Sequence, residues 1–229
     1  MLQLFFVKDI ANPNLEGVNA HHAERVLRMK VGEEILVSDG RGAWARCSIA
    51  TLSKKEVELT VIESGFEAVT KNEISVLQAI PKGDRAKETV ELLTASGATD
   101  IYPWQSARAI GKESDKWQVA AIEASKQSRR FYIPTVLPKL DTVSAIELLN
   151  NFNQILICHE SATVQISKEV KPVPKTLIVI GPEGGLTAEE LAVFESAGGK
   201  VIKLGRPVLR SAHAGIAAIS AVSALMQVW

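Results

Sequence analysis

The stretch LIVIGPEGGLTAEE, residues 177–190, combines residue types that can bind a small ligand. Apolar residues run directly into Gly181-Pro182-Glu183-Gly184-Gly185, and a helix signal follows at once. A strand, a glycine loop and a helix often form a phosphate cradle. This loop lacks the GxGxxG and GxxxxGK[ST] patterns, however, and Glu183 adds a negative charge. A neutral or cationic ligand that bonds to the backbone, such as an adenosine with a sulfonium, fits better; a plain tight turn is the alternative.

The residues after the loop predict a well-capped helix. Thr187 and Glu190 have the spacing of a capping box, and Leu186 and Leu191 that of a hydrophobic staple. Gly198-Gly199 can end the helix in a left-handed conformation. We therefore expect the loop at the carboxyl edge of a sheet, where open α/β folds bind ligands.

A second stretch, KLGRPVLRSAHAGIAAISAVSAL, repeats this arrangement from residue 203 onward. A strand is followed by Gly205 and Pro207, and then by a helix with Arg210 at its entrance. Helices rich in small residues usually serve close packing, and the small residues here are Ala214, Gly215, Ala217, Ala218, Ala221 and Ala224. Two glycine–proline loops that end neighbouring strands nevertheless favour a ligand site.

The elements that position these loops fall into two predicted domains. Residues 1–70 are β-rich, with strand-like runs at 35–37, 43–49 and 57–62 and a short helix at 21–29, and we expect a small barrel. From residue 73 to 229, short apolar strands alternate with helices, which predicts an α/β domain with a mostly parallel sheet. The strands are expected within 74–80, 99–104, 153–160, 175–180 and 200–205, and the first two helices within 83–98 and 116–128.

Composition and charge are those of an ordinary globular protein. The 229 residues are 46% hydrophobic and 23% charged, with a net charge of zero. Cys47 and Cys158 have no CxxC partner, so we expect neither a disulfide framework nor a zinc module, and a reducing cytoplasm fits. The N-terminus lacks the basic region of a signal peptide. The apolar last segment is interrupted by polar residues and predicts a buried helix rather than a membrane span.

Charge is distributed unevenly along the chain. Residues 105–130 hold six Lys/Arg against three Asp/Glu, a net of +3, whereas residues 131–200 hold five against eight, a net of −3. This asymmetry indicates a basic face on a neutral protein, although solvated helix charges give the same pattern.

The two loop stretches resemble the RsmE family of ribosomal RNA methyltransferases in the SPOUT superfamily. Two upstream stretches share this resemblance, KGDRAKETVELLTASGATDIYPWQSARAIGK and EASKQSRR. The stretch HHAERVLRMKVGEEILVSDGRG resembles the family's PUA-like RNA-binding barrel, so the likeness covers nearly the whole chain. It implies a SPOUT domain with a deep trefoil knot, an exception to the rule that chains do not thread their loops. It also implies a homodimer whose subunits share the active sites.

The resemblance implies methyl transfer from S-adenosylmethionine to N3 of a uridine, of the position-1498 type, in 16S ribosomal RNA. Uracil N3–H is an imide, so a proton must leave and charge builds on O2 and O4. Arg210 is predicted as the cation that stabilises this charge, and Glu183 as a catalytic residue that accepts a proton or bonds the cofactor. A structural arginine and a loop-shaping glutamate are the alternatives. No metal is expected.

Binding residues follow from the same resemblance. The cofactor is expected at three loops, on His159, Ile180, Gly181, Pro182, Gly184, Gly185, Leu204, Gly205, Val208 and Leu209. The expected partner is 16S ribosomal RNA within an assembled small subunit, held by Arg25, Arg28, Lys30, Lys82, Arg108, Arg129 and Arg130.

The chain departs from the family at several positions. The family commonly has Thr-Glu-Thr where this chain has Ser211-Ala212-His213, and glutamates where it has Ala95 and Ala107. Roles of those glutamates do not transfer, and we interpret His213 as a packed residue rather than a base. Two other functions stay open: a SPOUT methyltransferase for another RNA site, and an RNA-binding assembly factor without catalysis. The intact cofactor loops favour an enzyme.

Overall fold

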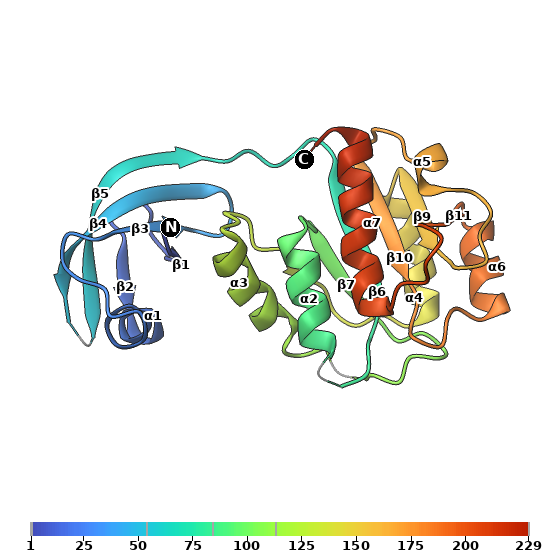
Figure 1. Cartoon of the computed structure of the whole chain (residues 1–229), viewed down its shortest axis with the longest axis horizontal. Coiled ribbons are helices and arrows are strands. Elements are labelled where there is room, and N and C mark those ends of the chain that lie inside the picture. Colours follow the sequence, from blue (N-terminus) through green and yellow to red (C-terminus); the bar gives the residue numbers. More distant parts are fainter. Residues whose placement is uncertain (1, 54, 84, 113, 229) are drawn as a thin grey trace. The chain divides into compact units, whose positions relative to one another are not determined.

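The structure is a computed structural model that describes residues 2–53, 55–83, 85–112 and 114–228. Its contacts divide the chain into two compact units (Figure 1). The N-terminal unit comprises Met1–Val69 with Ser125–Ile133, and the C-terminal unit comprises Thr70–Ala124 with Pro134–Trp229.

The C-terminal unit is built on a six-stranded sheet in which all neighbouring strands run parallel. The strand order is β11-β9-β10-β6-β7-β8. The strands are β6 Glu73–Ala79, β7 Asp100–Trp104, β8 Thr135–Val136, β9 Gln154–Cys158, β10 Lys175–Ile180 and β11 Lys200–Ile202. In the ladder, Ile180 pairs with both Cys158 and Gln78, and Ile202 pairs with Cys158. The loops that follow β6, β9, β10 and β11 therefore begin at one edge of the sheet.

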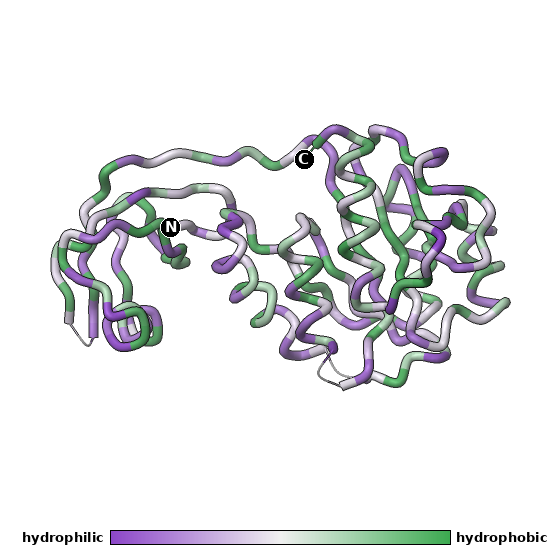
Figure 2. Tube along the Cα trace, viewed as in Figure 1, coloured by the Kyte–Doolittle hydropathy of each residue, from purple (hydrophilic) through white to green (hydrophobic). Residues whose placement is uncertain are grey.

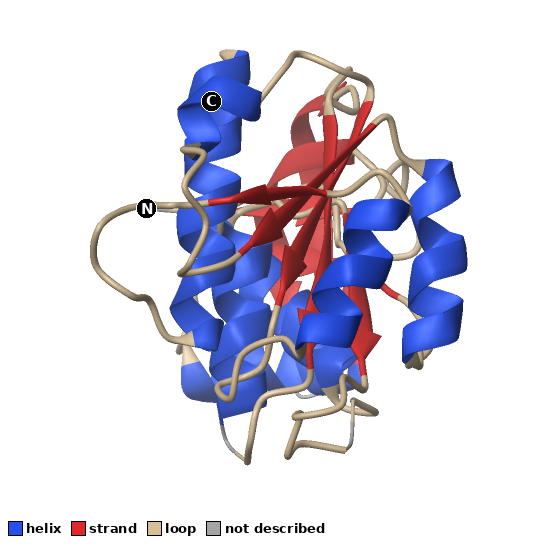
Figure 3. Ribbon diagram, turned by 90° about the vertical axis from the view of Figure 1, so that its right-hand side faces the viewer, coloured by secondary structure: helices blue, strands red, loops and turns tan. Residues whose placement is uncertain are grey.

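Helices cover both faces of this sheet (Figure 3). The helices are α2 Arg85–Ala95, α3 Trp117–Ser128, α4 Thr142–Leu148, α5 Ile166–Glu169, α6 Ala188–Ser196 and α7 Ser211–Met226, with a 3₁₀ turn at Leu149–Asn151. Val76 and Ile178 pack with residues of α2, α7 and the start of α3, whereas Leu77 and Val179 pack with residues of α4 and α6. The strands thus alternate between two apolar cores, as the period of a strand requires. Figure 2 shows hydrophobic residues along these strands.

The helix after the glycine loop begins as its sequence predicts. Thr187 is the N-cap of α6, and the reciprocal bonds of the capping box with Glu190 are both present. Leu186 and Leu191 belong to the same apolar core, and Gly198 has a φ of 94° just beyond the helix. These local signals are confirmed because they depend on neighbouring residues alone.

The C-terminal helix α7 packs inside the unit. Ala218, Ile219 and Val222 are fully buried in the core that α7 shares with α2. A Cβ on Gly215 would clash with Cδ2 of Leu93 on α2, so a small residue is needed at this crossing. Within the described residues, no helix is long and apolar enough to span a bilayer.

The N-terminal unit contains a five-stranded sheet in the order β1-β3-β4-β5-β2. The strands are β1 Leu4–Phe6, β2 Asn14–Glu16, β3 Glu34–Ser38, β4 Ala43–Leu52 and β5 Glu56–Phe66. β1 pairs with β3 in parallel, and the other pairs are antiparallel. Helix α1 Gly17–His21 continues as a π-helical turn His22–Val26. Helix α1 begins before the range of 21–29 predicted for this helix, and Arg28, just beyond the turn, has a φ of 54°.

Residues 125–133 belong to the N-terminal unit, although the sequence-based division assigned them to residues 73–229. The ring of Phe131 stacks on Trp44 of β4, with centroids 5.5 Å apart. The Tyr132 hydroxyl donates to the Glu67 carbonyl at 2.7 Å, and Arg129 Nε donates to the Leu2 carbonyl at 2.9 Å. Hydrophobic periodicity locates elements along the chain but carries no information on such long-range grouping, which explains the difference.

Candidate functional site

Two adjoining pockets lie at the carboxyl edge of the parallel sheet. The larger, of about 540 Å³, is lined by Pro182–Gly185, Val208–Ser211, Arg85 and Glu160. The smaller, of about 80 Å³, is lined by Cys158–Glu160, Lys203–Leu209 and Ala214. Because Glu160, Val208 and Leu209 line both pockets, the loops after β9, β10 and β11 contribute to one continuous site.

The glycine loop is a closed turn. The Gly185 N–H donates to the Pro182 carbonyl at 2.9 Å, and Gly185 has a φ of 72°. A Cβ on Gly185 would meet open space, so the left-handed backbone, and not a lack of room, requires glycine there. A Cβ on Gly184 would lie 3.4 Å from Cβ of Arg108, which is an ordinary van der Waals contact, so the loop packs against Arg108 at this position.

Arg108 and Glu190 join the loop after β7 to the glycine loop. Arg108 Nη1 donates to the Gly184 carbonyl at 2.9 Å and, more weakly, to the Leu186 carbonyl at 3.4 Å. Glu190 is buried and uses both carboxylate oxygens: one accepts from the Ala107 N–H at 2.7 Å and the other from the Thr187 N–H at 3.0 Å. The capping carboxylate therefore also holds the chain segment that carries Arg108.

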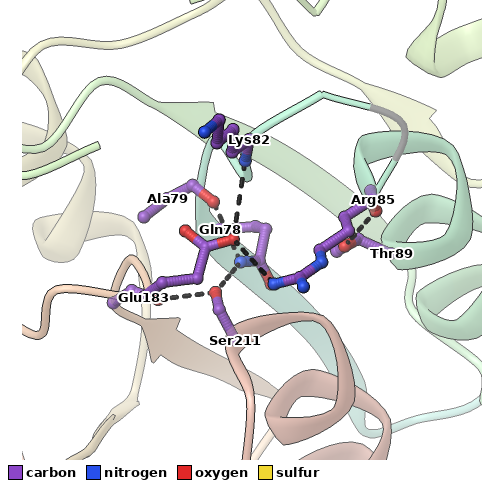
Figure 4. Close-up of polar contacts among 8 residues, drawn as sticks. Gln78, Ala79, Lys82, Arg85, Thr89, Glu183 and Ser211 are labelled. Carbon is purple, nitrogen blue, oxygen red and sulfur yellow. Dashed lines mark hydrogen bonds and ion pairs between the residues drawn. The ribbon is translucent and has the colours of Figure 1, made fainter. Parts of the chain in front are cut away.

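A buried relay of hydrogen bonds links β6, the glycine loop and the start of α7 (Figure 4). Gln78 Nε2 donates to Ser211 Oγ at 3.0 Å and to the Ala79 carbonyl at 3.0 Å. Ser211 Oγ in turn donates to the Gly181 carbonyl at 2.6 Å. This relay fixes the two glycine–proline loops relative to each other.

The Glu183 carboxylate points away from the rest of its loop toward the segment after β6 (Figure 4). Its Oε1 accepts from the Lys82 N–H at 3.5 Å and lies 3.9 Å from Arg85 Nη1. The side chains of Arg85 and Glu183 are 47% and 27% exposed, so solvent screens this contact. Arg85 lines the larger pocket, and we did not single it out from the sequence, where KGDRAKE contains no spacing that marks a site.

Arg210 lies at the N-cap of α7 and lines the larger pocket. Its side chain is exposed, and it makes no hydrogen bond or ion pair with any residue that the structure describes. The helix N-terminus adds positive electrostatic potential at the same place. A guanidinium so placed can bind an anion that enters the pocket.

The predicted cofactor residues divide into two groups. Eight line the pockets: His159, Pro182, Gly184, Gly185, Leu204, Gly205, Val208 and Leu209. Ile180 and Gly181 do not, because Ile180 is buried in the core and the Gly181 carbonyl bonds to Ser211. His159 is oriented by Ser161, whose Oγ lies 2.8 Å from Nδ1.

The predicted RNA residues occur in different environments. Arg25, Arg28 and Lys30 are exposed and close in sequence in the N-terminal unit, and Lys82 is exposed beside the glycine loop. Arg108 is engaged with that loop. Arg129 bonds to Leu2, and burial lowers the pKa of Arg130 to about 10 against the opposing effect of Glu67. Arg108, Arg129 and Arg130 therefore have intramolecular roles that the sequence did not reveal.

Two further titratable side chains lie near the site. The His213 side chain is half-exposed and its Nε2 lies 3.4 Å from Glu88 Oε1, so the interpretation as a packed residue was wrong. Burial raises the pKa of the Cys158 thiol to about 12, and the thiol therefore stays protonated at the pocket wall. Burial therefore disfavours a thiolate at this position.

Comparisons with known proteins agree with this geometry. Residues 69–223 match the model of the RNA methyltransferase domain, and residues 15–62 match that of the RNA methyltransferase PUA domain. Ribosomal RNA small subunit methyltransferase E of Mycobacterium tuberculosis is 30% identical, with 99% of this chain and 93% of that protein covered. The same-named protein of Bacillus subtilis is 30% identical, with 92% and 89% covered. The chain belongs to the RsmE family.

A solved RsmE structure has the same fold throughout. The protein from Neisseria gonorrhoeae, crystallised with S-adenosylmethionine, is 26% identical, covers 98% of both chains and superposes with a TM-score of 0.87. A SpoU methyltransferase from Streptomyces viridochromogenes, AviRb, is only 14% identical and superposes with a TM-score of 0.50 over 76% of this chain. The RsmE fold therefore extends over both units, whereas the more distant likeness concerns a part of the chain.

Proposed function

We propose that this chain is an S-adenosylmethionine-dependent methyltransferase that modifies N3 of a uridine in 16S ribosomal RNA. The observation that supports this most strongly is the full-length likeness to RsmE proteins, one of which was crystallised with S-adenosylmethionine. The pockets at the carboxyl edge of the sheet are formed by the loops on which the sequence predicted the cofactor.

The residues present fit this cofactor. A pocket of about 540 Å³ is within the range of about 300–1,000 Å³ for small-molecule sites. It contains carboxylates, Glu160 and Glu183, and an exposed glycine loop, and it contains no pattern for polyphosphate. His159, Pro182–Gly185, Gly205, Val208 and Leu209 would hold the cofactor, which supplies an electrophilic methyl group on a sulfonium.

Arg210 is the proposed catalytic cation. Uracil becomes nucleophilic at N3 only as its imide proton leaves, and the negative charge then spreads to O2 and O4. Arg210 lies at the N-terminus of α7, and its guanidinium has no competing partner among the described residues, so it can donate to those oxygens. Glu183 is the proposed second residue, with a role in shaping the loop or accepting the proton.

The finer assignments extend this proposal. The N-terminal unit would act as a PUA-like RNA-binding barrel, with Arg25, Arg28 and Lys30 as phosphate contacts. The C-terminal unit would be a SPOUT domain with a trefoil knot, and two copies would form a homodimer. The substrate would be the assembled small subunit in the cytoplasm. Sedimentation of the protein at micromolar concentration tests the dimer directly.

A methyl-transfer assay tests the central proposal. Small subunits from a strain lacking the gene are incubated with the protein and S-adenosylmethionine, and the 16S RNA is digested and analysed by mass spectrometry. The expected product is one 3-methyluridine per subunit. A methyl group on another base or another RNA contradicts the substrate, and cofactor binding without methylation of any RNA identifies an assembly factor.

A further inference from the structure

Four peptide groups make up the glycine loop from Glu183 to Thr187. The second and the fourth of them are held by hydrogen bonds within the protein. The group between Gly184 and Gly185 donates its N–H to Pro182, and its carbonyl accepts from Arg108. The group between Leu186 and Thr187 donates its N–H to Glu190, and its carbonyl also accepts from Arg108. Arg108 is thus the common partner of both carbonyls.

The two intervening peptide groups have a different status. Those between Glu183 and Gly184 and between Gly185 and Leu186 make no hydrogen bond with any residue that the structure describes. Glu183, Gly184 and Gly185 line the larger pocket. Since a backbone N–H or carbonyl is a strong hydrogen-bonding group, these two peptides are the ones available to a ligand.

We propose that Arg108 is a positioning residue for the cofactor loop, and that its guanidinium orients these two free peptide groups toward the ligand. The inference rests on the proposed function for the identity of the ligand. The residues that hold Arg108 support it: Glu190 fixes the preceding amide, and Ala109 N–H donates to the Ser106 carbonyl at 3.1 Å. The aliphatic part of Arg108 also packs against Gly184, within 3.5 Å of where a Cβ would be.

This role differs in its consequences from a contact with RNA phosphate. A phosphate contact would contribute to RNA affinity and to its salt dependence, and its loss would lower the salt slope by about one. A positioning residue would instead change cofactor affinity and the mobility of the loop. Arg108 holds two carbonyls with one nitrogen, so a lysine can replace it in part, because an ammonium also donates to carbonyl oxygens.

The experiment compares Arg108→Met, Arg108→Lys and the matched control Lys112→Met. Lys112 belongs to the same loop and carries the same charge, and its side chain has no described contact with residues 181–187. Hydrogen exchange of the Gly185 and Thr187 amides is measured in the ligand-free protein, and S-adenosylmethionine affinity is measured by calorimetry. RNA affinity is measured over a salt series.

Arg108→Met is expected to speed exchange at both amides and to weaken cofactor binding by about tenfold, because hydrogen bonds from a charged donor are lost. Arg108→Lys should restore part of both, and Lys112→Met should change neither. The inference would be overturned if Arg108→Met left both amide exchange and cofactor affinity unchanged. It would also be overturned if this variant lowered the RNA salt slope while cofactor binding stayed normal. If the wild type fails to bind S-adenosylmethionine, the proposed function fails, while the exchange data still test the role of Arg108 in the loop.

Discussion

The Glu183 carboxylate makes its described contacts with the segment after β6 rather than within its own glycine loop. The Lys82 N–H donates to it and Arg85 lies nearby, so this side chain ties the loop after β10 to the segment after β6. Pro182 has a related role, since its carbonyl closes the turn. Pro182 and Glu183 therefore both contribute contacts to the shape of the loop.

Substitution of Glu183 separates its two proposed roles. Glu183→Gln keeps an acceptor for the Lys82 N–H but removes the proton acceptor, and we expect kcat within about fivefold of wild type. Glu183→Ala loses the acceptor, and we expect the KM for S-adenosylmethionine to rise by about tenfold. Glu195→Gln, exposed on α6 and outside the lining of both pockets, is the control. A fall in kcat of about a hundredfold or more for Glu183→Gln, with the cofactor KM unchanged, would identify a catalytic base.

At the scale of elements, the packing of α2 against α7 sets the position of Arg210. Gly215 is one turn beyond the start of α7 and faces Leu93, which is fully buried. Ser211, at the first position of the same helix, is tied to Gln78 and Gly181. A shift of α7 would therefore move Arg210 and the second glycine–proline loop together.

Gly215→Val tests this crossing. Overpacking against Leu93 costs about 1–3 kcal/mol of stability. Replacement of a helical glycine by a residue of higher helix propensity gains less than about 1 kcal/mol. We expect the free energy of unfolding to fall by about 2 kcal/mol, and Leu93→Ala in the same chain to restore part of it. Gly205→Ala should be nearly neutral, since a Cβ there meets only Pro207 Cδ at 3.8 Å. Equal stability of Gly215→Val and wild type in denaturant titrations would show that the helices do not meet as described.

Asp100 at the start of β7 predicts a dependence of stability on pH. Burial raises the pKa of this carboxyl, and the Glu73 charge acts in the same direction, although Ser75 and Lys175 oppose them. A raised pKa means that the native state binds the proton more tightly than the unfolded state. Asp100 therefore favours folding while it is protonated, and this contribution is lost as the pH rises through its native pKa.

Asp100→Asn should accordingly raise the melting temperature near neutral pH, and the gain should shrink as the pH falls below the usual range for aspartate. Asp141 is a control of opposite sign, because a hydrogen bond from the Ser144 N–H lowers its pKa at the N-cap of α4. Asp141→Asn should lower the melting temperature near neutral pH and have little effect in acid. Thermal unfolding of both variants over a pH series gives the comparison, and parallel curves for the two would refute the assignment.

The chain as a whole is neutral, so RNA affinity must depend on local clusters. Arg28→Glu with Lys30→Glu should weaken RNA binding and reduce the salt slope by about two. Arg129→Met should leave the slope unchanged and lower stability, because Arg129 bonds to Leu2 inside the N-terminal unit. RNA affinities over a salt series, together with melting temperatures, test this prediction. If the salt slope changes only for Arg129→Met, the assignment of the RNA contact to Arg28 and Lys30 is wrong.

Much of this molecule could be predicted from local patterns. The strands β6, β7, β9, β10 and β11, the capping box of α6 and the loops at one sheet edge all depend on periodicity and near neighbours. The partners of Arg108, Glu183 and Arg129 lie 76, 101 and 127 residues away, so only the folded chain could reveal them. Short elements such as β1, β2 and β8 were missed because two or three residues carry no periodic signal.

The grouping of residues 125–133 with the N-terminal unit also constrains how the protein can be made. Trp44 leaves the ribosome long before Phe131, its stacking partner, so the N-terminal unit stays incomplete until Ile133 has been synthesised. By then the strands β6 and β7 and the helix α2 have also been synthesised. A fragment cut at residue 70 would leave Trp44 without that ring and Gly42 without Tyr132. The N-terminal unit therefore cannot be completed before β6, α2 and β7 of the C-terminal unit have been synthesised.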